Sequence, residues 1–240
     1  MSSTDNDEKI RAEAVEFAKS NKKTIAKRRT NKEQFPQEEN PVSVFMAGSP
    51  GAGKTEASIA LLERFKRPII RIDPDELRGE FSQYTGGNAH LFQGAVSILV
   101  DKIHDLVMDQ KQSFLLDGTL SRYEVANRNI KRSLEKKRAV QILYVYQEPK
   151  LAWEFVQARE ALEGRRIQVE SFIEQYFGAR EVVNRLKREY QSRIKVDLLI
   201  KNIDNSQRSY RAGIDQIDNH VPESYTRDEL GKMFKVLEGA

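Results

Sequence analysis

The sequence of 240 residues contains no cysteine, which excludes disulfide bonds. It also has no run of 18 apolar residues and no leader in which basic residues precede an apolar stretch, so we expect neither a membrane span nor a secretory signal. The hydrophobic content of 39% is enough for one substantial α/β core with short additions at its ends. These features favour a cytoplasmic protein with one main domain.

Positive and negative charges are nearly balanced. The chain has 40 lysine and arginine residues against 36 aspartate and glutamate residues, which gives a net charge of +4 and a pI near 9.1. An excess this small suits phosphorylated ligands and does not by itself indicate a nucleic-acid partner.

A glycine-rich segment stands between an apolar run at Val42–Ala47 and a helix-compatible stretch at Glu56–Arg64. The order of strand, glycine-rich loop and helix is that of a P-loop. Backbone N–H groups of such a loop surround a polyphosphate, and glycine allows the close approach that a β-carbon would block. The predicted nucleotide-binding residues are Gly48, Ser49, Pro50, Gly51, Ala52, Gly53, Lys54 and Thr55.

Lys54 and Thr55 carry the chemistry expected of this loop. The lysine ammonium of a P-loop reaches the β- and γ-phosphates, and the threonine hydroxyl is a ligand of Mg²⁺. ATP and Mg²⁺ are therefore the expected cofactors. An ordinary tight turn between a strand and a helix is the alternative interpretation.

Two acidic residues follow a short apolar strand predicted at 68–73. Asp73 precedes a proline and stands three residues before Glu76, which is the arrangement of a helix N-cap. Asp75 does not cap, and ligands of open α/β sheets bind at the carboxyl ends of the strands. We predict that Asp73 caps a helix and that Asp75 accepts the proton of an attacking hydroxyl.

Another apolar strand, predicted at 113–117, ends in Asp117 and is followed by Thr119. A carboxylate in this position beside a P-loop can orient Mg²⁺ or its waters, or bind a substrate hydroxyl, although turn formation alone would also explain it. We assign Asp117 to the metal and, with Thr119, to substrate binding. A capping box, Ser121 to Glu124, is expected to open the next helix.

A loop predicted at 81–90 contains Tyr84 and a pair of glycines. It is interpreted either as a segment that closes over the substrate, with Tyr84 in contact, or as a plain connector. From Leu91 onward, apolar residues at helical spacing predict a long amphipathic helix.

Arginines gather between a fourth strand, predicted at 139–146, and a fifth, predicted at 196–200. Arg159, Arg165 and Arg166 flank a glycine that separates two predicted helices. A lid that carries arginines can fold over the γ-phosphate and stabilise charge on the transferring group. Surface arginines are common, so the assignment of each one stays open.

The ends of the chain are predicted to be helical. Residues 1–40 contain a helix from Asp7 to Arg28 and a basic cluster, and we separate them as an N-terminal extension from a main domain at 41–240. This helix either packs on the main domain, contacts nucleic acid or acts as a regulatory arm. Two further helices, at 210–217 and 227–237, are expected to pack over the sheet.

Together these motifs resemble the zeta-toxin family of P-loop kinases. The GSPGAGKT loop alone is generic, and the stretches IDPDELR at 72–78 and LLDGTLS at 115–121 make the match specific. The resemblance covers about residues 40–205. It implies an adenylate-kinase-like, three-layer α/β P-loop fold with a mostly parallel, five-stranded sheet. The N-terminal helical extension would be added to that fold.

The resemblance also implies an activity and a partner. Many members of the family use ATP to phosphorylate the 3′-hydroxyl of the amino sugar in UDP-N-acetylglucosamine, and a separate small helical antitoxin commonly neutralises them at the nucleotide site. By position, Asp75 would be the base, and Arg159 with either Arg165 or Arg166 would form the lid. The family often has glutamate where this chain has Asp117, and the shorter side chain makes the same sugar contact less direct.

Two other functions stay open. A P-loop kinase of this kind could act on a nucleoside, an antibiotic or an RNA end, or the chain could be a binding protein that ATP regulates. In an RNA-end kinase the basic arm would bind nucleic acid. Under the resemblance to the zeta-toxin family, residues 1–40 could instead be a docking surface for the antitoxin or part of a self-inhibitory arm.

Overall fold

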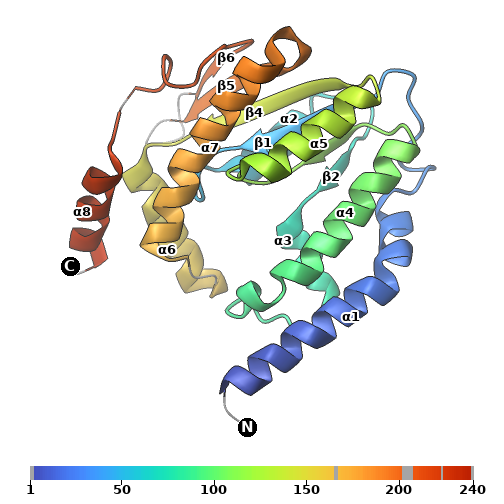
Figure 1. Ribbon diagram of the computed structural model, residues 1–240, viewed down its shortest axis with the longest axis horizontal. Helices are drawn as coiled ribbons and strands as arrows, with labels where there is room; N and C mark the ends of the chain where they lie inside the picture. The colour runs from blue at the N-terminus through green and yellow to red at the C-terminus, as the bar shows by residue number, and fades with distance from the viewer. Residues whose placement is uncertain (1–2, 165–166, 202–207, 223, 239–240) are drawn as a thin grey trace.

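The computed structural model describes residues 3–164, 167–201, 208–222 and 224–238. Its centre is a six-stranded sheet in the order β2-β3-β1-β4-β5-β6 (Figure 1). The strands are β1 (Val42–Ala47), β2 (Ile70–Ile72), β3 (Phe114–Leu116), β4 (Ala139–Tyr146), β5 (Lys195–Lys201) and β6 (Arg208–Arg211). Strands β1 to β5 are parallel, so their carboxyl ends meet at one edge of the sheet.

The helices are α1 (Ser3–Arg29), α2 (Lys54–Leu62), α3 (Pro74–Leu77), α4 (Gln93–Asp109), α5 (Tyr123–Glu135), α6 (Pro149–Glu163), α7 (Val169–Tyr190) and α8 (Arg227–Glu238). Short 3₁₀ turns, η1 (Arg78–Glu80), η2 (Ala89–Leu91) and η3 (Gln191–Arg193), lie between them. Helices cover both faces of the sheet, which confirms the predicted three-layer α/β architecture (Figure 1).

Two hydrophobic clusters hold these layers together. On one face, α2 packs against the sheet through Ala57 and Leu61, which contact strand residues such as Val44 and Leu115. On the other face, a larger cluster joins α1, α4, α5 and α7 to the sheet. Because β1, β3 and β4 are buried on both faces, they are mostly apolar, as parallel strands usually are.

Strand β6 adds an antiparallel edge that the sequence did not predict. Tyr210 lies opposite Leu199 of β5, so the helix predicted at 210–217 is wrong. The reason is Asp197, which is fully buried and needs hydrogen-bond donors. The Tyr210 hydroxyl and the Gly213 backbone N–H donate to it over 2.5 Å and 2.8 Å, and this holds the segment extended beside β5.

The predicted N-terminal helix is present as α1 and lies alongside α4 (Figure 1). Ala18, Ile25 and Ala26 of α1 are buried in the larger hydrophobic cluster. At its carboxyl end Arg29 donates a hydrogen bond of 3.0 Å to Glu80, in the η1 turn. Of the alternatives for this helix, packing on the main domain therefore applies, while contact with a partner stays a prediction.

The two predicted caps had different outcomes. Asp73 caps α3, because its Oδ1 accepts a hydrogen bond of 2.7 Å from the Asp75 backbone N–H, as predicted. The capping box at Ser121 is wrong, because α5 begins at Tyr123 and no side chain caps it. Ser121 instead places its hydroxyl 3.1 Å from that of Thr119.

Among the helices of the described ranges, we find none whose length and apolar content would allow it to cross a membrane.

Candidate active site

The P-loop follows β1 at the carboxyl edge of the sheet and adopts conformations that need glycine. Gly48 and Gly51 have φ angles of 133° and 71°, which side chains rarely tolerate. A β-carbon on Gly51 would lie 2.0 Å from the Ala152 carbonyl oxygen of α6, and one on Gly48 would lie 2.3 Å from that of Val145 in β4. The loop is therefore held against β4 and α6 by close backbone contacts.

Lys54, at the start of α2, folds back over this loop. Its Nζ donates hydrogen bonds to the carbonyl oxygens of Gly48 and Ser49, over 3.0 Å and 2.6 Å. Burial lowers the pKa of Lys54 to about 8, while the carboxylates of Asp117 and Asp75 act in the opposite direction. The predicted lysine and the two predicted carboxylates thus lie close enough to interact electrostatically.

Two buried carboxylates, those of Asp73 and Asp117, come from the ends of neighbouring strands. Asp73 follows β2, Asp117 follows β3, and the Asp117 backbone N–H donates 2.9 Å to the Ile72 carbonyl oxygen. Both side chains are buried, and burial raises the pKa of Asp73 although the Arg71 guanidinium opposes that shift. The sequence placed these aspartates at this edge, and the structure brings them together there.

Arg71, in the middle of β2, was missed by the sequence analysis. Its Nη2 donates to Asp73 Oδ2 over 2.6 Å and to Asp117 Oδ2 over 2.7 Å. Its Nε donates 3.1 Å to the buried Ser58 hydroxyl, which in turn donates 3.1 Å to Asp117. An arginine inside a short apolar strand was the available signal, because a buried cation in a sheet requires acidic partners.

Asp75 is held by arginines from two directions. Arg159 of α6 reaches across the site and donates to Asp75 Oδ2 over 2.7 Å, and Arg78 bonds to Asp75 Oδ1. The Asp75 and Arg159 side chains are 37% and 44% exposed, so the pair is open to solvent and can exchange partners when an anion enters. Arg165 and Arg166, the other predicted lid residues, lie outside the described residues.

The end of α6 meets the glycine pair of the predicted substrate loop. Gly164 ends the helix with a φ of 70°, and a β-carbon there would lie 3.2 Å from the Gly87 backbone nitrogen. Tyr84 of the same loop packs edge-on against Phe92, with ring centroids 5.8 Å apart. The contact of Tyr84 with a substrate stays a prediction.

A hollow of about 460 Å³ opens beside Asp117, between β3, α4 and α5. Thr119 and Arg78 line it together with apolar side chains of α4 and α5 such as Val96 and Val125. Asn129 also lines it, is 6% exposed, and has no hydrogen-bond partner for its Oδ1 within the described residues. The hollow can therefore accept a molecule with both apolar and hydrogen-bonding groups.

The residues present fit Mg²⁺ only together with a nucleotide. Thr55 is exposed at the first turn of α2, as a P-loop metal ligand would be. Within the described ranges no group of three or more histidine or acidic side chains could hold a metal by itself. Asp117 Oδ2 already accepts from Arg71 and Ser58, so a contact through metal-bound water suits this residue better than direct ligation.

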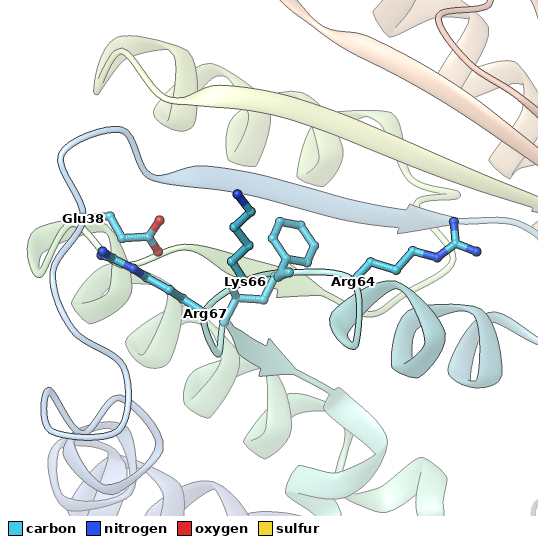
Figure 2. Close-up of a pocket in the computed structure, with 6 residues that line it drawn as sticks. Glu38, Arg64, Lys66 and Arg67 are labelled. Carbon is cyan, nitrogen blue, oxygen red and sulfur yellow. The ribbon is translucent and has the colours of Figure 1, made fainter.

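A second hollow of about 370 Å³ lies at the far end of α2 (Figure 2). Glu38, Arg64, Lys66 and Arg67 line it, but Figure 2 shows Arg64, Lys66 and Arg67 pointing in different directions. Because these cations diverge, they do not form a site for one anion. None of the predicted catalytic residues that the structure describes, Lys54, Asp75 and Arg159, lines this hollow.

The sequence matches the model of a known protein family. The family model described as Zeta toxin matches residues 25–215, which is about four fifths of the chain. Among curated proteins no sequence matches this one significantly.

Solved structures match over most of the chain. A chain from the structural characterisation of the PezAT chromosomal toxin–antitoxin system of Streptococcus pneumoniae is 16% identical, with a TM-score of 0.61, and the match covers 95% of this chain and 94% of that one. A chain from the crystal structure of AvrRxo1-ORF1:-ORF2 with ATP is 17% identical, with a TM-score of 0.57, and the match covers 94% and 71%. At these identities the likeness establishes a common fold.

Proposed function

Since this chain belongs to the zeta-toxin family, we propose that it is a kinase that transfers the γ-phosphate of ATP to a hydroxyl group of a small molecule. The observation that supports this most strongly is the convergence of Lys54, Asp75, Asp117 and Arg159 at one edge of the sheet. A P-loop alone would support nucleotide binding only. A carboxylate beside the lysine and an arginine from the opposite side add the groups that phosphoryl transfer needs.

Each group has a proposed role in this reaction. Lys54 would leave the carbonyl oxygens of the loop and bind the β- and γ-phosphates. Their negative charge would stabilise the protonated form of Lys54, which burial disfavours. Arg159 would exchange Asp75 for the γ-phosphate and stabilise its charge during transfer. That exchange frees an oxygen of Asp75 to accept the proton of the attacking hydroxyl.

Thr55 and Asp117 are the proposed metal residues. Thr55 would hold Mg²⁺ and Asp117 would orient its waters, and the bound ion would supply positive charge to the phosphates. Arg71 is a positioning residue in this scheme, because it fixes the orientation of Asp117.

UDP-N-acetylglucosamine is the proposed acceptor, through the 3′-hydroxyl of its amino sugar. The hollow beside Asp117 supports an acceptor of this kind, because it combines apolar walls with Arg78, Thr119 and Asn129. A guanidinium suits a phosphate-bearing ligand, and a buried carboxamide suits sugar hydroxyls. A nucleoside, an antibiotic or an RNA end is the alternative acceptor.

A small antitoxin protein is the proposed partner. This is supported by the family and by the PezAT system, whose description names a toxin and an antitoxin. We also propose that the protein works in the cytoplasm, where ATP is available.

The test is transfer of labelled γ-phosphate from ATP to UDP-N-acetylglucosamine, with mass spectrometry of the product. We expect the wild type to add one phosphate and both Lys54→Ala and Asp75→Asn to lose at least about a hundredfold in rate. Lys66→Ala and Asp109→Asn, at exposed positions, are the matched controls and should keep wild-type rates.

Two outcomes would change the proposal. Binding of ATP without phosphorylation of the sugar nucleotide would reject this acceptor and require a screen of metabolites and RNA ends. Binding of ATP with no acceptor at all, and no effect of Asp75→Asn, would instead favour a binding protein that ATP regulates.

A further inference from the structure

Lys201 is the last residue of β5 and lies at the same sheet edge as the P-loop. Although it is a lysine, its side chain is only 6% exposed. A β-carbon built on Gly53 would lie 1.9 Å from Lys201 Nζ and 3.1 Å from its Cε. Because glycine has no β-carbon, the ammonium group rests directly against the backbone of the P-loop.

The surroundings of this ammonium group favour an anion. Gly53 is the N-cap of α2, so the positive end of the helix dipole lies at this point. Lys54, the next residue, adds a second ammonium group to the same loop. Glu56 Oε2 would lie 3.0 Å from the same β-carbon position and offsets part of this charge. A polyphosphate bound at this helix N-terminus would bring its negative charge next to both ammonium groups.

The order of the strands indicates which part of a nucleotide Lys201 would meet. In the sheet, β1 and its P-loop stand between β3 on one side and β4 and β5 on the other. Asp117 and Asp75 lie on the β3 and β2 side, so the γ-phosphate must point that way to be transferred. Lys201 approaches from β5, on the opposite side, where the rest of the nucleotide would lie.

We propose that Lys201 is a nucleotide-binding residue that contacts the part of the nucleotide that is not transferred, with the α-phosphate as the anion. This inference rests on the proposed use of ATP. It differs from the P-loop assignment, because the residue comes from the fifth strand and no motif marks it. Lys54 would serve the transferring end and Lys201 the retained end.

The experiment is titration calorimetry of the full chain with ATP and with ADP. Lys201→Gln should weaken the Kd for both nucleotides about tenfold, and by the same factor, because both carry the α-phosphate. Lys201→Arg keeps the charge and should stay within about threefold of wild type. Lys66→Gln, an exposed lysine at the other end of α2, is the control and should bind like wild type. Melting temperatures without nucleotide confirm that each variant is folded.

The outcomes separate this inference from the proposed function. If the wild type binds ATP and Lys201→Gln binds it equally well, the inference is wrong and the kinase proposal stands. The inference is also wrong if Lys201→Gln weakens ATP but not ADP, since the lysine would then face the γ-phosphate. Equal losses in Lys201→Gln and Lys201→Arg would reject a role for the charge. If the wild type binds neither nucleotide, both proposals fail.

Discussion

His104 on α4 is a buried titratable group outside the candidate site. It is 1% exposed, its ring packs edge-on against Phe114 with centroids 4.8 Å apart, and its Nε2 has no hydrogen-bond partner within the described residues. Burial, together with the smaller effect of the Arg132 charge, lowers the pKa of His104 to about 4. The imidazole is therefore neutral in the folded protein at neutral pH.

This histidine should make the fold sensitive to acid. Between pH 6.5 and about 4 the unfolded chain binds a proton that the folded protein does not, so the free energy of unfolding falls as the pH falls. The loss should reach roughly 3 kcal/mol below pH 4, because one pKa unit corresponds to about 1.4 kcal/mol. Urea denaturation at several pH values measures it.

The matched variants separate His104 from other titrating groups. His104→Leu should remove this part of the pH dependence, whereas His90→Leu, at an exposed position, should leave it unchanged. Identical acid profiles for His104→Leu and the wild type would mean that the imidazole is already accessible to protons.

At the scale of single elements, α3 sets the spacing of the site. It has only four residues, and Asp73 starts it by accepting from the Asp75 N–H while its other oxygen accepts from Arg71. One residue thus joins the helix cap to the carboxylates of the site. A helix this short has little stability of its own, so the cap and the arginine decide where Asp75 lies.

Asp73→Asn and Asp75→Asn should therefore behave differently. Asp73→Asn can keep the cap but loses the charge that faces Arg71, and we expect it to cost about 2 kcal/mol of stability. If Asp73 acted only as a helix cap, the substitution would lower the free energy of unfolding by ~1 kcal/mol or less. Asp75→Asn should cost little stability, because its pair is exposed, while it removes phosphate transfer.

Urea denaturation and an ATP-binding titration on both variants measure these effects. The reverse result, with Asp75→Asn unfolding the protein and Asp73→Asn stopping transfer at full stability, would exchange the two roles.

In the molecule as a whole, α1 packs against α4 and belongs to the hydrophobic core. Its buried side chains join the larger core, and Arg28 and Arg29 bond to Glu80, three residues beyond Leu77 at the end of α3. Arg29 also lies 3.7 Å from Glu76. Glu76 in turn pairs with Arg71, so ion pairs connect α1 to the carboxylates of the site. A self-inhibitory arm would need to leave these contacts, which makes a fixed structural role the better interpretation.

We expect Ile25→Ala to lower the free energy of unfolding by about 2–4 kcal/mol, because it opens a cavity between α1 and the core. For a chain of this size that corresponds to a fall in melting temperature of roughly 5–15 °C. Lys23→Ala, on the exposed side of the same helix, is the control and should change the melting temperature by about 1 °C or less. Thermal unfolding followed by circular dichroism measures both.

Deletion of residues 1–38 tests the same point on a larger scale. It should leave α4 uncovered and the chain unstable. A truncated protein with the wild-type melting temperature would show that α1 is a separable arm, and its activity and antitoxin binding would then decide between regulation and docking.

Local features of this protein could be predicted from its residues alone. The P-loop, the cap at Asp73, the five parallel strands and the amphipathic α4 depend on residues close together in the chain, and patterns of glycine, proline and apolar spacing report them. Asp75 and Asp117 were also found this way, because each follows a strand.

Contacts between segments far apart in the chain became visible only in the folded protein. Strand β6 forms because buried Asp197 recruits Tyr210 and the turn after it, which no local pattern could indicate. The pairs of Arg71 with Asp117 and of Arg159 with Asp75 join residues 46 and 84 positions apart. Lys201 likewise contacts Gly53 of the P-loop, which is far from it in the sequence. For Arg71 and Asp197 burial of a charged group selects its partner, and for Arg159 the fold brings α6 next to α3; both are known only once the chain is folded.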